Sequence, residues 1–262
     1  MNTGICVYDC HDHRKLINIF KKLGIDRTFL HYRGENFPDV VKLYVENGII
    51  CETIHSPFSK INDMWSEDEK AAKEMVDSLK DSIDICKKYN IPIAVVHLSS
   101  GYPMPPMNEK GIERFDEVFS YAKENGVIVA LENQRFTENL SFFMARHETL
   151  TFCWDNGHEY GFTKGIRFMD TYGDRTTCIH IHDNRCGINT DDHLIPFDGN
   201  IDFNIVAKDL AKNGFDGTLM LEIGKTATCG DVSPYENMTD EEYIEHAFNA
   251  AKKLASMVDD LR

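Results

Sequence analysis

A repeated alternation of short apolar runs and longer amphipathic segments constrains the fold of this chain more than any other feature. The short runs are rich in β-branched and aromatic residues and predict eight strands, at Gly4–Tyr8, Thr28–Tyr32, Ile49–His55, Ile93–His97, Val127–Glu132, Thr151–Asp155, Thr177–His182 and Gly217–Glu222. Helical patterns separate these runs, so successive strands must run parallel and be buried on both faces. Eight such units in 262 residues predict an α/β fold of the (β/α)8 TIM-barrel class.

An open, doubly wound sheet is the alternative to a closed barrel. Such a sheet often carries a glycine-rich phosphate loop after its first strand, but neither G-x-G-x-x-G nor G-x-x-x-x-G-K-[ST] follows Gly4–Tyr8. The chain also has no Gly/Ser linker and no break in composition. We therefore predict a single domain, with the barrel spanning residues 1–262.

Local signals also predict where helices begin and end. Ser66 with Glu69, and Thr239 with Glu242, have the spacing of a capping box at a helix N-terminus. Four glycines follow helical patterns and precede predicted strands, where a left-handed residue commonly ends a helix: Gly24, Gly48, Gly126 and Gly214.

Polar side chains close six consecutive predicted strands. In a TIM barrel the carboxyl ends of the strands form the mouth where the active site is built. The residues at these ends are His55, His97, Glu132, Asp155, His180 with His182, and Glu222. Carboxylates that converge in a buried place repel one another and lose solvation unless a cation or protons neutralise them. A divalent metal ion is the simplest explanation for this pattern.

Mixed imidazole and carboxylate donors suit transition metals and suit calcium poorly. We predict Glu132, Asp155, His180 and Glu222 as the metal ligands, because each comes from a different strand end. His182 points to the same side of its strand as His180, so either histidine could bind the metal while the other contacts the substrate. Zinc, manganese, cobalt and iron all suit this donor set, and the sequence does not choose among them.

Several motifs in this part of the chain resemble a known family. Leu131-Glu132-Asn133, Trp154-Asp155-Asn156-Gly157-His158, His180-Ile-His-Asp-Asn184, Asp191-Asp-His193 and Pro196-Phe-Asp-Gly-Asn-Ile-Asp-Phe203 resemble the xylose isomerase-like TIM-barrel superfamily. That superfamily includes sugar and sugar-phosphate isomerases and epimerases, inosose-processing enzymes and the DNA-repair nuclease endonuclease IV. The resemblance covers nearly the whole chain and includes His55-Ser-Pro-Phe58 and the segment ending in Ser100-Gly101.

The two branches of the superfamily imply different metal contents. The isomerases and epimerases imply one metal held by Glu132, Asp155, His180 and Glu222, with His158 touching the substrate. The endonucleases imply three zinc ions and nine ligands, whose counterparts here are His55, His97, Glu132, Asp155, His158, His180, Asp191, His193 and Glu222. The chain departs from the family pattern at His182, where many relatives have lysine, and at Asp198-Gly199-Asn200.

The composition bears on partners and compartment. A net charge of −15 disfavours nucleic acid as a partner, because proteins that follow a phosphate backbone need a basic face. The longest apolar stretches are far shorter than the roughly 20 residues of a membrane helix. The N-terminus lacks the features of a secretory signal, and the eight cysteines form no C-x-x-C pair. We expect a cytoplasmic protein with reduced thiols.

These observations lead to a first functional hypothesis, a metal-dependent isomerase or epimerase of a small sugar, sugar phosphate, sugar acid or cyclitol. The metal would polarise the substrate carbonyl, and Glu132 and Glu222 would transfer the proton through an enediolate. His158 and His182 would orient hydroxyls, and Arg185 would contact a distal hydroxyl, carboxylate or phosphate. Phe58 and Trp65 follow the third strand, where they either form an apolar wall for a sugar or belong to the core.

Two other hypotheses remain from the sequence. A zinc phosphodiesterase of the endonuclease IV type is permitted by the ligand set but disfavoured by the acidic composition. A metal-stabilised barrel that only binds a sugar would leave the paired glutamates without a purpose. The expected partner is a small carbohydrate, and the helix pairing common in the superfamily leaves a homo-oligomer open.

Overall fold

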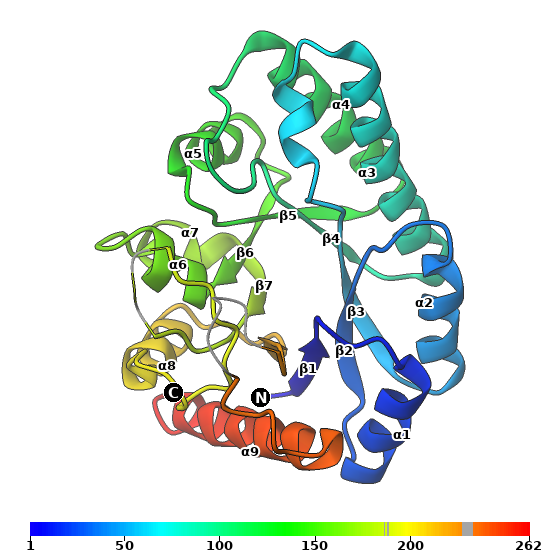
Figure 1. Ribbon diagram of the computed structural model, residues 1–262. Helices are drawn as coiled ribbons and strands as arrows, with labels where there is room; N and C mark the ends of the chain where they lie inside the picture. The colour runs from blue at the N-terminus through cyan, green and yellow to red at the C-terminus, as the bar shows by residue number, and fades with distance from the viewer. Residues whose placement is uncertain (186, 188, 227–232) are drawn as a thin grey trace.

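The computed structural model describes residues 1–185, 187, 189–226 and 233–262, and it confirms the predicted TIM-barrel fold (Figure 1). All eight predicted strands are present, with ends that differ from the predicted ones by at most two residues: β1 (Thr3–Val7), β2 (Arg27–His31), β3 (Ile50–His55), β4 (Ile93–Val96), β5 (Ile128–Glu132), β6 (Thr151–Asp155), β7 (Thr176–His180) and β8 (Leu219–Ile223). The helices are α1 (His13–Leu23), α2 (Phe37–Glu46), α3 (Glu69–Tyr89), α4 (Glu109–Glu124), α5 (Thr137–Arg146), α6 (Asn156–Phe162), α7 (Phe168–Tyr172), α8 (Phe203–Lys212) and α9 (Asp240–Asp259), with short 3-10 helices at Ile61–Trp65 (η1) and Gly173–Arg175 (η2).

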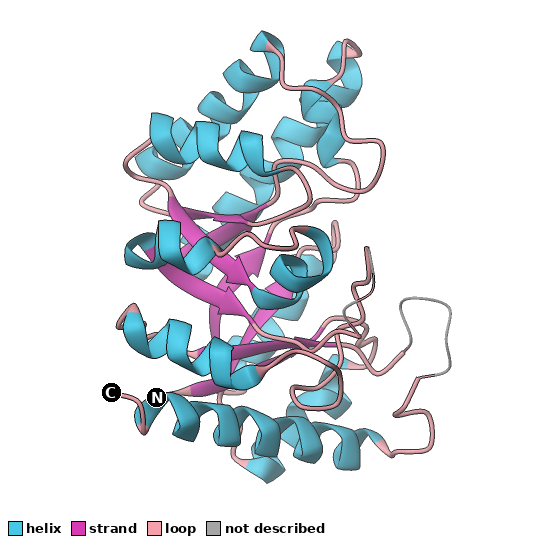
Figure 2. Cartoon of the chain, turned by 90° about the vertical axis from the view of Figure 1, so that its left-hand side faces the viewer, coloured by secondary structure: helices cyan, strands magenta, loops and turns pink. Residues whose placement is uncertain are grey.

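The strands are parallel and curl around a common axis. Strands β2 to β7 form one sheet in chain order, and β1 pairs with β8. Beyond β7, a bridge between Ile181 and Leu221 of β8 brings the two sheets together. The helices surround the strands in Figures 1 and 2, and the two chain ends lie side by side, where the Met1 amino group is 2.7 Å from Asp259.

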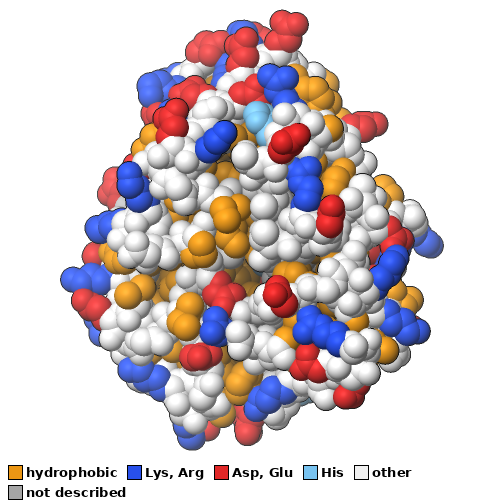
Figure 3. All heavy atoms as spheres, turned by 180° about the vertical axis from the view of Figure 1, so that it is seen from behind, with side chains coloured by type: hydrophobic (Ala, Val, Ile, Leu, Met, Phe, Trp, Pro, Cys, Tyr) orange, Lys and Arg blue, Asp and Glu red, His pale blue; other side chains and the backbone are white. Residues whose placement is uncertain are grey.

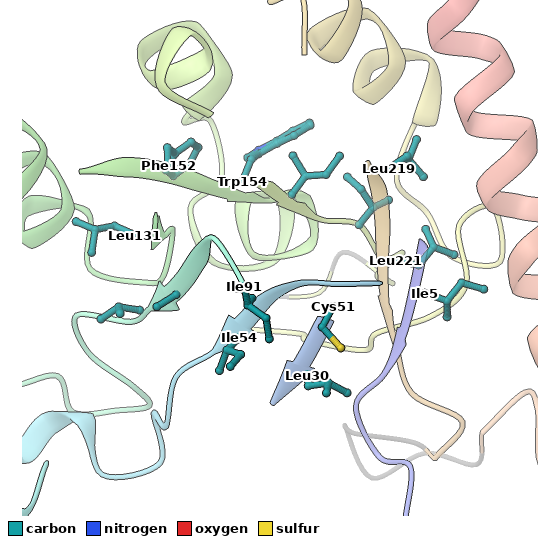
Figure 4. Packing of buried hydrophobic residues seen from close by; sticks show 14 of the residues in the cluster. Ile5, Leu30, Cys51, Ile54, Ile91, Leu131, Phe152, Trp154, Leu219 and Leu221 are labelled. Carbon is teal, nitrogen blue, oxygen red and sulfur yellow. The ribbon is translucent and has the colours of Figure 1, made fainter. Parts of the chain in front are cut away.

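Most of the core lies between the strands and the helices. Figure 4 shows part of this cluster, with Leu131 on β5, Trp154 on β6 and Leu221 on β8, all fully buried. A smaller cluster fills the barrel interior with side chains of modest size: Ile93, Val95, Ala130, Cys153 and Cys178. On the outer surface seen in Figure 3, lysines and arginines are interspersed with acidic residues. This pattern is typical of the solvated faces of amphipathic helices.

One of the two predicted capping boxes is wrong. Helix α3 begins at Glu69 with Asp68 as its N-cap, and the Asp68 carboxylate accepts hydrogen bonds from the backbone N–H groups of Lys70 and Ala71 at 3.0 and 3.1 Å. Ser66 instead ends η1, and its hydroxyl accepts from the backbone N–H of Asp68. The 3-10 turn moves the helix start two residues along the chain, so the carboxylate takes the capping position.

The remaining helix-end predictions are confirmed. Thr239 and Glu242 form a reciprocal capping box at the start of α9. The four glycines predicted to end helices all have positive φ angles: Gly24, Gly48, Gly126 and Gly214. Of the described helices, none combines the length and apolar character needed to cross a membrane. The six described cysteines are free, while Cys186 and Cys229 lie outside the described residues.

Candidate metal centre

The ends of strands β5, β6, β7 and β8 bring four potential metal ligands together. We call Glu132, Asp155, His180 and Glu222 the central donor group; all four are buried, and one donor atom of each lies within 4.8 Å of the others. His180 Nδ1 is 3.2 Å from Glu132 Oε2 and 3.4 Å from Glu222 Oε2. The four residues predicted as ligands from their strand ends are therefore neighbours in space.

A second group lies beside the first and contains the other histidine of the seventh-strand motif. We call His158, His182, Asp191 and His193 the outer donor group; their donor atoms also lie within 4.8 Å of one another. Asp191 is central to it, with carboxylate oxygens 3.5 Å from His158 Nε2 and 3.3 Å from His193 Nε2. His180 and His182, which the sequence could not tell apart, thus belong to different groups.

A third group, formed by His55, His97 and Glu132, occupies the ends of β3, β4 and β5. Both histidines place Nε2 at 3.2 Å from Glu132 Oε2. Next to it, His31 at the end of β2 has its Nε2 3.0 Å from Glu222 Oε1. All nine residues that the endonuclease resemblance names are found in these three groups, and His31 and His182 add two further imidazoles.

Backbone hydrogen bonds orient several of these imidazoles. The ring Nδ1 of His55 is 2.9 Å from the backbone oxygen of Ser56, and that of His193 is 3.1 Å from the backbone oxygen of Glu222. A carbonyl partner requires Nδ1 to carry the proton. In the neutral imidazole Nε2 is then unprotonated, and its lone pair is available to a metal ion. In both residues it is Nε2 that faces a carboxylate of the donor groups.

The junction of β6 and α6 fixes the position of Asp155 and His182. Asp155 ends β6 and caps α6, accepting a hydrogen bond from the backbone N–H of His158 at 2.6 Å. Asn133, which follows β5, donates to the backbone oxygen of Asp155 and accepts from its N–H, both at 2.8 Å. Gly157 leaves room for His182, because a Cβ there would lie 1.9 Å from the imidazole Cε1.

The charges of the central group are strongly coupled. Burial raises the pKa of Glu132, but His97 and His180 outweigh this effect and hold the pKa well below its usual value. Burial lowers the pKa of His180, yet Glu222 and Glu132 raise it to about 9. His193 responds in the same way to Asp191, with a pKa of about 10. Because metal ligands must be unprotonated imidazoles, cation binding here would displace these protons.

Unpartnered buried atoms show that the central group fits a divalent ion. Glu132 Oε2, Asp155 Oδ2, His180 Nδ1 and His180 Nε2 are buried without a hydrogen-bond partner among the described residues. Each unsatisfied buried polar group costs about 1–3 kcal/mol, more if charged. Imidazole and carboxylate donors at this spacing are ligands for zinc, manganese or cobalt.

A cavity of about 550 Å³ opens at the mouth of the barrel beside these groups. Its lining includes donor-group residues, aromatic side chains and two arginines: His31, Asp191, His193, Glu222, Tyr8, Phe58, Arg33 and Arg135. Phe58 contacts this space with its ring 4.8 Å from that of His97. Trp65 instead belongs to the core, where its Nε1 donates to the backbone oxygen of Leu98.

Other candidate residues differ from their expected surroundings. The guanidinium of Arg185 is 2.5 Å from the buried carboxylate of Asp192, and Arg185 is not among the residues that line the 550 Å³ cavity. The sequence reasoning missed Gln134, whose side-chain amide lies 3.2 Å from His97 Nε2 and 3.0 Å from His158 Nδ1. It also missed His31, because the predicted strand ended at Tyr32, whereas β2 ends at His31. Arg33 and Arg135 lie in loops and carried no such signal.

Comparisons with known proteins agree with this architecture. The family model described as xylose isomerase-like TIM barrel matches residues 17–254. The chain is 25% identical over 241 residues to the uncharacterized protein y4fM of Sinorhizobium fredii, covering 82% of this chain and 74% of that protein. Two uncharacterized proteins of Methanocaldococcus jannaschii, MJ1311 and MJ1614, are 26% and 28% identical over 64% and 61% of this chain. The chain covers 63% and 66% of the lengths of these two archaeal relatives.

Solved structures share the fold over almost their full length. D-psicose 3-epimerase from Clostridium cellulolyticum H10, solved with D-tagatose, has a TM-score of 0.76 at 19% identity, covering 98% of this chain and 99% of that chain. The IolI protein, solved with a bound zinc atom, has a TM-score of 0.73 at 16% identity, covering 99% of both chains. At these identities the similarity establishes the fold.

Proposed function

The chain belongs to the xylose isomerase-like TIM barrel family, and on that premise we propose that it is a metal-dependent isomerase or epimerase of a small carbohydrate. The observation that carries the proposal is the approach of Glu132 and Glu222, from β5 and β8, to the same nitrogen of His180. Two carboxylates beside one metal ligand are the arrangement that a two-base proton transfer requires. We also propose that residues 1–262 form one domain.

The central donor group would hold the metal, a manganese, cobalt, magnesium or zinc ion, one per chain. A divalent ion bound there supplies Lewis acidity toward the carbonyl oxygen of a ketose or aldose. The similar folds of D-psicose 3-epimerase and of the zinc-binding IolI protein support this assignment.

The protein's own side chains account for the proton transfer. Glu222 lines the cavity, and its Oε1 is 3.0 Å from His31 Nε2. Glu132 is buried beside it, so its carboxylate is shielded from bulk water. One carboxylate removes the proton from the carbon next to the carbonyl, and the other returns a proton to the neighbouring carbon or to the opposite face. His158 and His182 hold substrate hydroxyls if the outer donor group carries no metal, whereas the pairing of Arg185 with Asp192 argues against the substrate contact expected for it from the sequence.

A second candidate function has one specific observation in its favour. The three donor groups contain every counterpart of the nine endonuclease IV ligands, and in each group the donor atoms lie within 4.8 Å of one another. A zinc phosphodiesterase would use all three groups to activate water and stabilise the leaving oxygen. Elemental mass spectrometry separates the two functions: about one metal per chain favours the isomerase, and three zinc ions favour the phosphodiesterase.

Proton exchange with solvent is the direct test of the proposed function. The metal-loaded protein would be incubated in D2O with a panel of ketoses, ketose phosphates, sugar acids and cyclitols, and deuterium uptake at carbon followed by NMR. Glu132→Gln and Glu222→Gln should each slow exchange by about 10²–10⁴-fold, the usual contribution of a general acid or base. The matched control is Glu117→Gln, because Glu117 is an exposed glutamate of α4 whose partner is Lys80. Full exchange in metal-loaded Glu132→Gln would contradict the proposed role.

A further inference from the structure

We propose that the outer part of the 550 Å³ cavity is an anion subsite, in which Arg135 and Arg33 bind a phosphate or carboxylate group of the substrate. This inference rests on the proposed function, since it names the class of carbohydrate that the cavity accepts. The two arginines follow β5 and β2, three residues after Glu132 and two residues after His31. Both line the same cavity as Glu222 and His193, so an anionic group held by them lies in the same space as the donor groups.

Arg135 has the features of a ligand-binding arginine. It is half-buried, and its guanidinium lies over the ring of Phe162 at 3.4 Å from the ring centroid. Among the described residues, no carboxylate or other acceptor lies within bonding distance of this guanidinium. Stacking on an aromatic ring fixes the plane of the group while leaving its N–H donors at the edge available. Two such N–H donors can bind two oxygens of one phosphate or carboxylate group at the same time.

Arg33 supplies a second cation at the same cavity. One of its terminal nitrogens donates to the backbone oxygen of Tyr8, another cavity residue, and this hydrogen bond ties the side chain to the end of β1. Because this backbone oxygen carries no net charge, the hydrogen bond does not neutralise the positive charge of Arg33. Arg185 differs, because it is paired with the buried carboxylate of Asp192.

The charge of the whole chain makes these two arginines informative. At a net charge of −15, the protein repels anions unless cations are placed where the ligand binds. The carboxylates that line the cavity, Asp191 and Glu222, face histidines: Asp191 lies 3.3 Å from His193, and Glu222 lies 3.0 Å from His31. Both carboxylates thus have imidazole neighbours within the donor groups, and Arg33 and Arg135 bring positive charge to the same cavity.

The size and lining of the cavity define the substrate further. A volume of about 550 Å³ is within the range of small-molecule sites, roughly 300–1,000 Å³. Phe58 offers an apolar surface to the C–H face of a sugar. The substrate class is thus a short carbohydrate with its carbonyl end at the metal and a phosphate or carboxylate at the other end.

Binding of inorganic phosphate tests the subsite without knowledge of the substrate. Isothermal titration of the metal-loaded protein would be compared with Arg135→Gln, Arg33→Gln and the double variant. Arg146→Gln is the matched control, because it removes the same charge from an exposed residue of α5 paired with Asp116. Loss of a hydrogen bond to a charged group should weaken phosphate binding about 10–100-fold in Arg135→Gln. Equal phosphate affinity in the double variant and the wild type would overturn the proposal.

Turnover then separates the two kinds of anion and the two proposals. A ketose phosphate as the best substrate points to phosphate, and a sugar acid points to carboxylate; in either case Arg135→Gln should raise KM far more than it lowers kcat. If no carbohydrate exchanges deuterium while phosphate binding still depends on Arg135, the proposed function fails and the subsite stands. A neutral sugar as the best substrate, with turnover unaffected by Arg135→Gln, would refute the subsite and leave the isomerase assignment intact.

Discussion

Replacing Gly157 by alanine should destabilise the protein, although the same change in an ordinary helix stabilises it. Gly157 is the second residue of α6, and Gly→Ala inside a helix normally gains about 1 kcal/mol. Here the new Cβ would lie 1.9 Å from Cε1 and 2.3 Å from Nε2 of His182. These are ring atoms of a fully buried residue, so the imidazole cannot turn aside into solvent.

The magnitude follows from what His182 loses. Overpacking a core costs about 1–3 kcal/mol. Displacing the ring also separates its Nε2 from Asp155 Oδ1, now 3.2 Å away, and leaving a buried polar group without its partner costs about 1–3 kcal/mol. After subtraction of the helix gain, the net destabilisation is about 3 kcal/mol. For a protein of this size that corresponds to a fall in Tm of roughly 6–12 °C.

A double-mutant cycle provides the assay and the control. Thermal and urea unfolding would be measured for Gly157→Ala, His182→Ala and the double variant. Because the clash needs both the new methyl group and the imidazole, the double variant should be no less stable than His182→Ala alone. A Gly157→Ala protein with the wild-type Tm, or a double variant in which the two losses simply add, would refute the steric argument.

Two further predictions concern metal removal and acid. Chelation of the metal should lower Tm, because a ligand at about 1,000 times its Kd stabilises the folded state by about 4 kcal/mol, or roughly 8–16 °C; an unchanged Tm after exhaustive chelation would argue against a resident metal. The second concerns Asp116, where burial raises the pKa but hydrogen bonds from Arg146 and His147 outweigh it and hold the pKa below its usual value. This contribution is full above the unfolded-state pKa of about 4 and is lost as the pH falls through the folded-state pKa. Asp116→Asn should therefore cost at most about 1 kcal/mol at pH 7 and progressively less as the pH falls below about 4 in urea unfolding, and a constant difference across that range would contradict the ion pair.

Features that depend on neighbours in the sequence were predictable. Apolar runs of strand length, separated by helical periodicity, identified all eight strands, because burial on both faces requires apolar residues at successive positions. The polar residues that end these runs identified the four members of the central donor group. A barrel brings all strand ends to one mouth, so a one-dimensional pattern is enough to predict that these residues converge. The rule missed His31 because the predicted second strand, Thr28–Tyr32, extends one residue past the observed end of β2.

Helix starts were less certain because several local signals compete. Ser66 and Asp68 are both good N-cap residues, and their spacing from the helix does not choose between them. The packed 3-10 turn at Ile61–Trp65 ends at Ser66 and leaves Asp68 to cap α3. At the start of α9 the Thr239 capping box formed as predicted.

Only the tertiary structure decided which side chains became partners. The sequence does not distinguish His180 from His182, but β7 ends at His180. Ile181 forms a bridge to β8, and His182 then lies next to Asp155 as a member of the outer donor group. Arg185 and Arg135 both follow strand ends, yet one is paired with Asp192 and the other faces the cavity. The sequence by itself determined the order of strands and helices and the donors at the strand ends, since periodicity is a local property. The contacts among those donors depend on loops and strands far apart in the chain, so they are fixed only when the barrel closes.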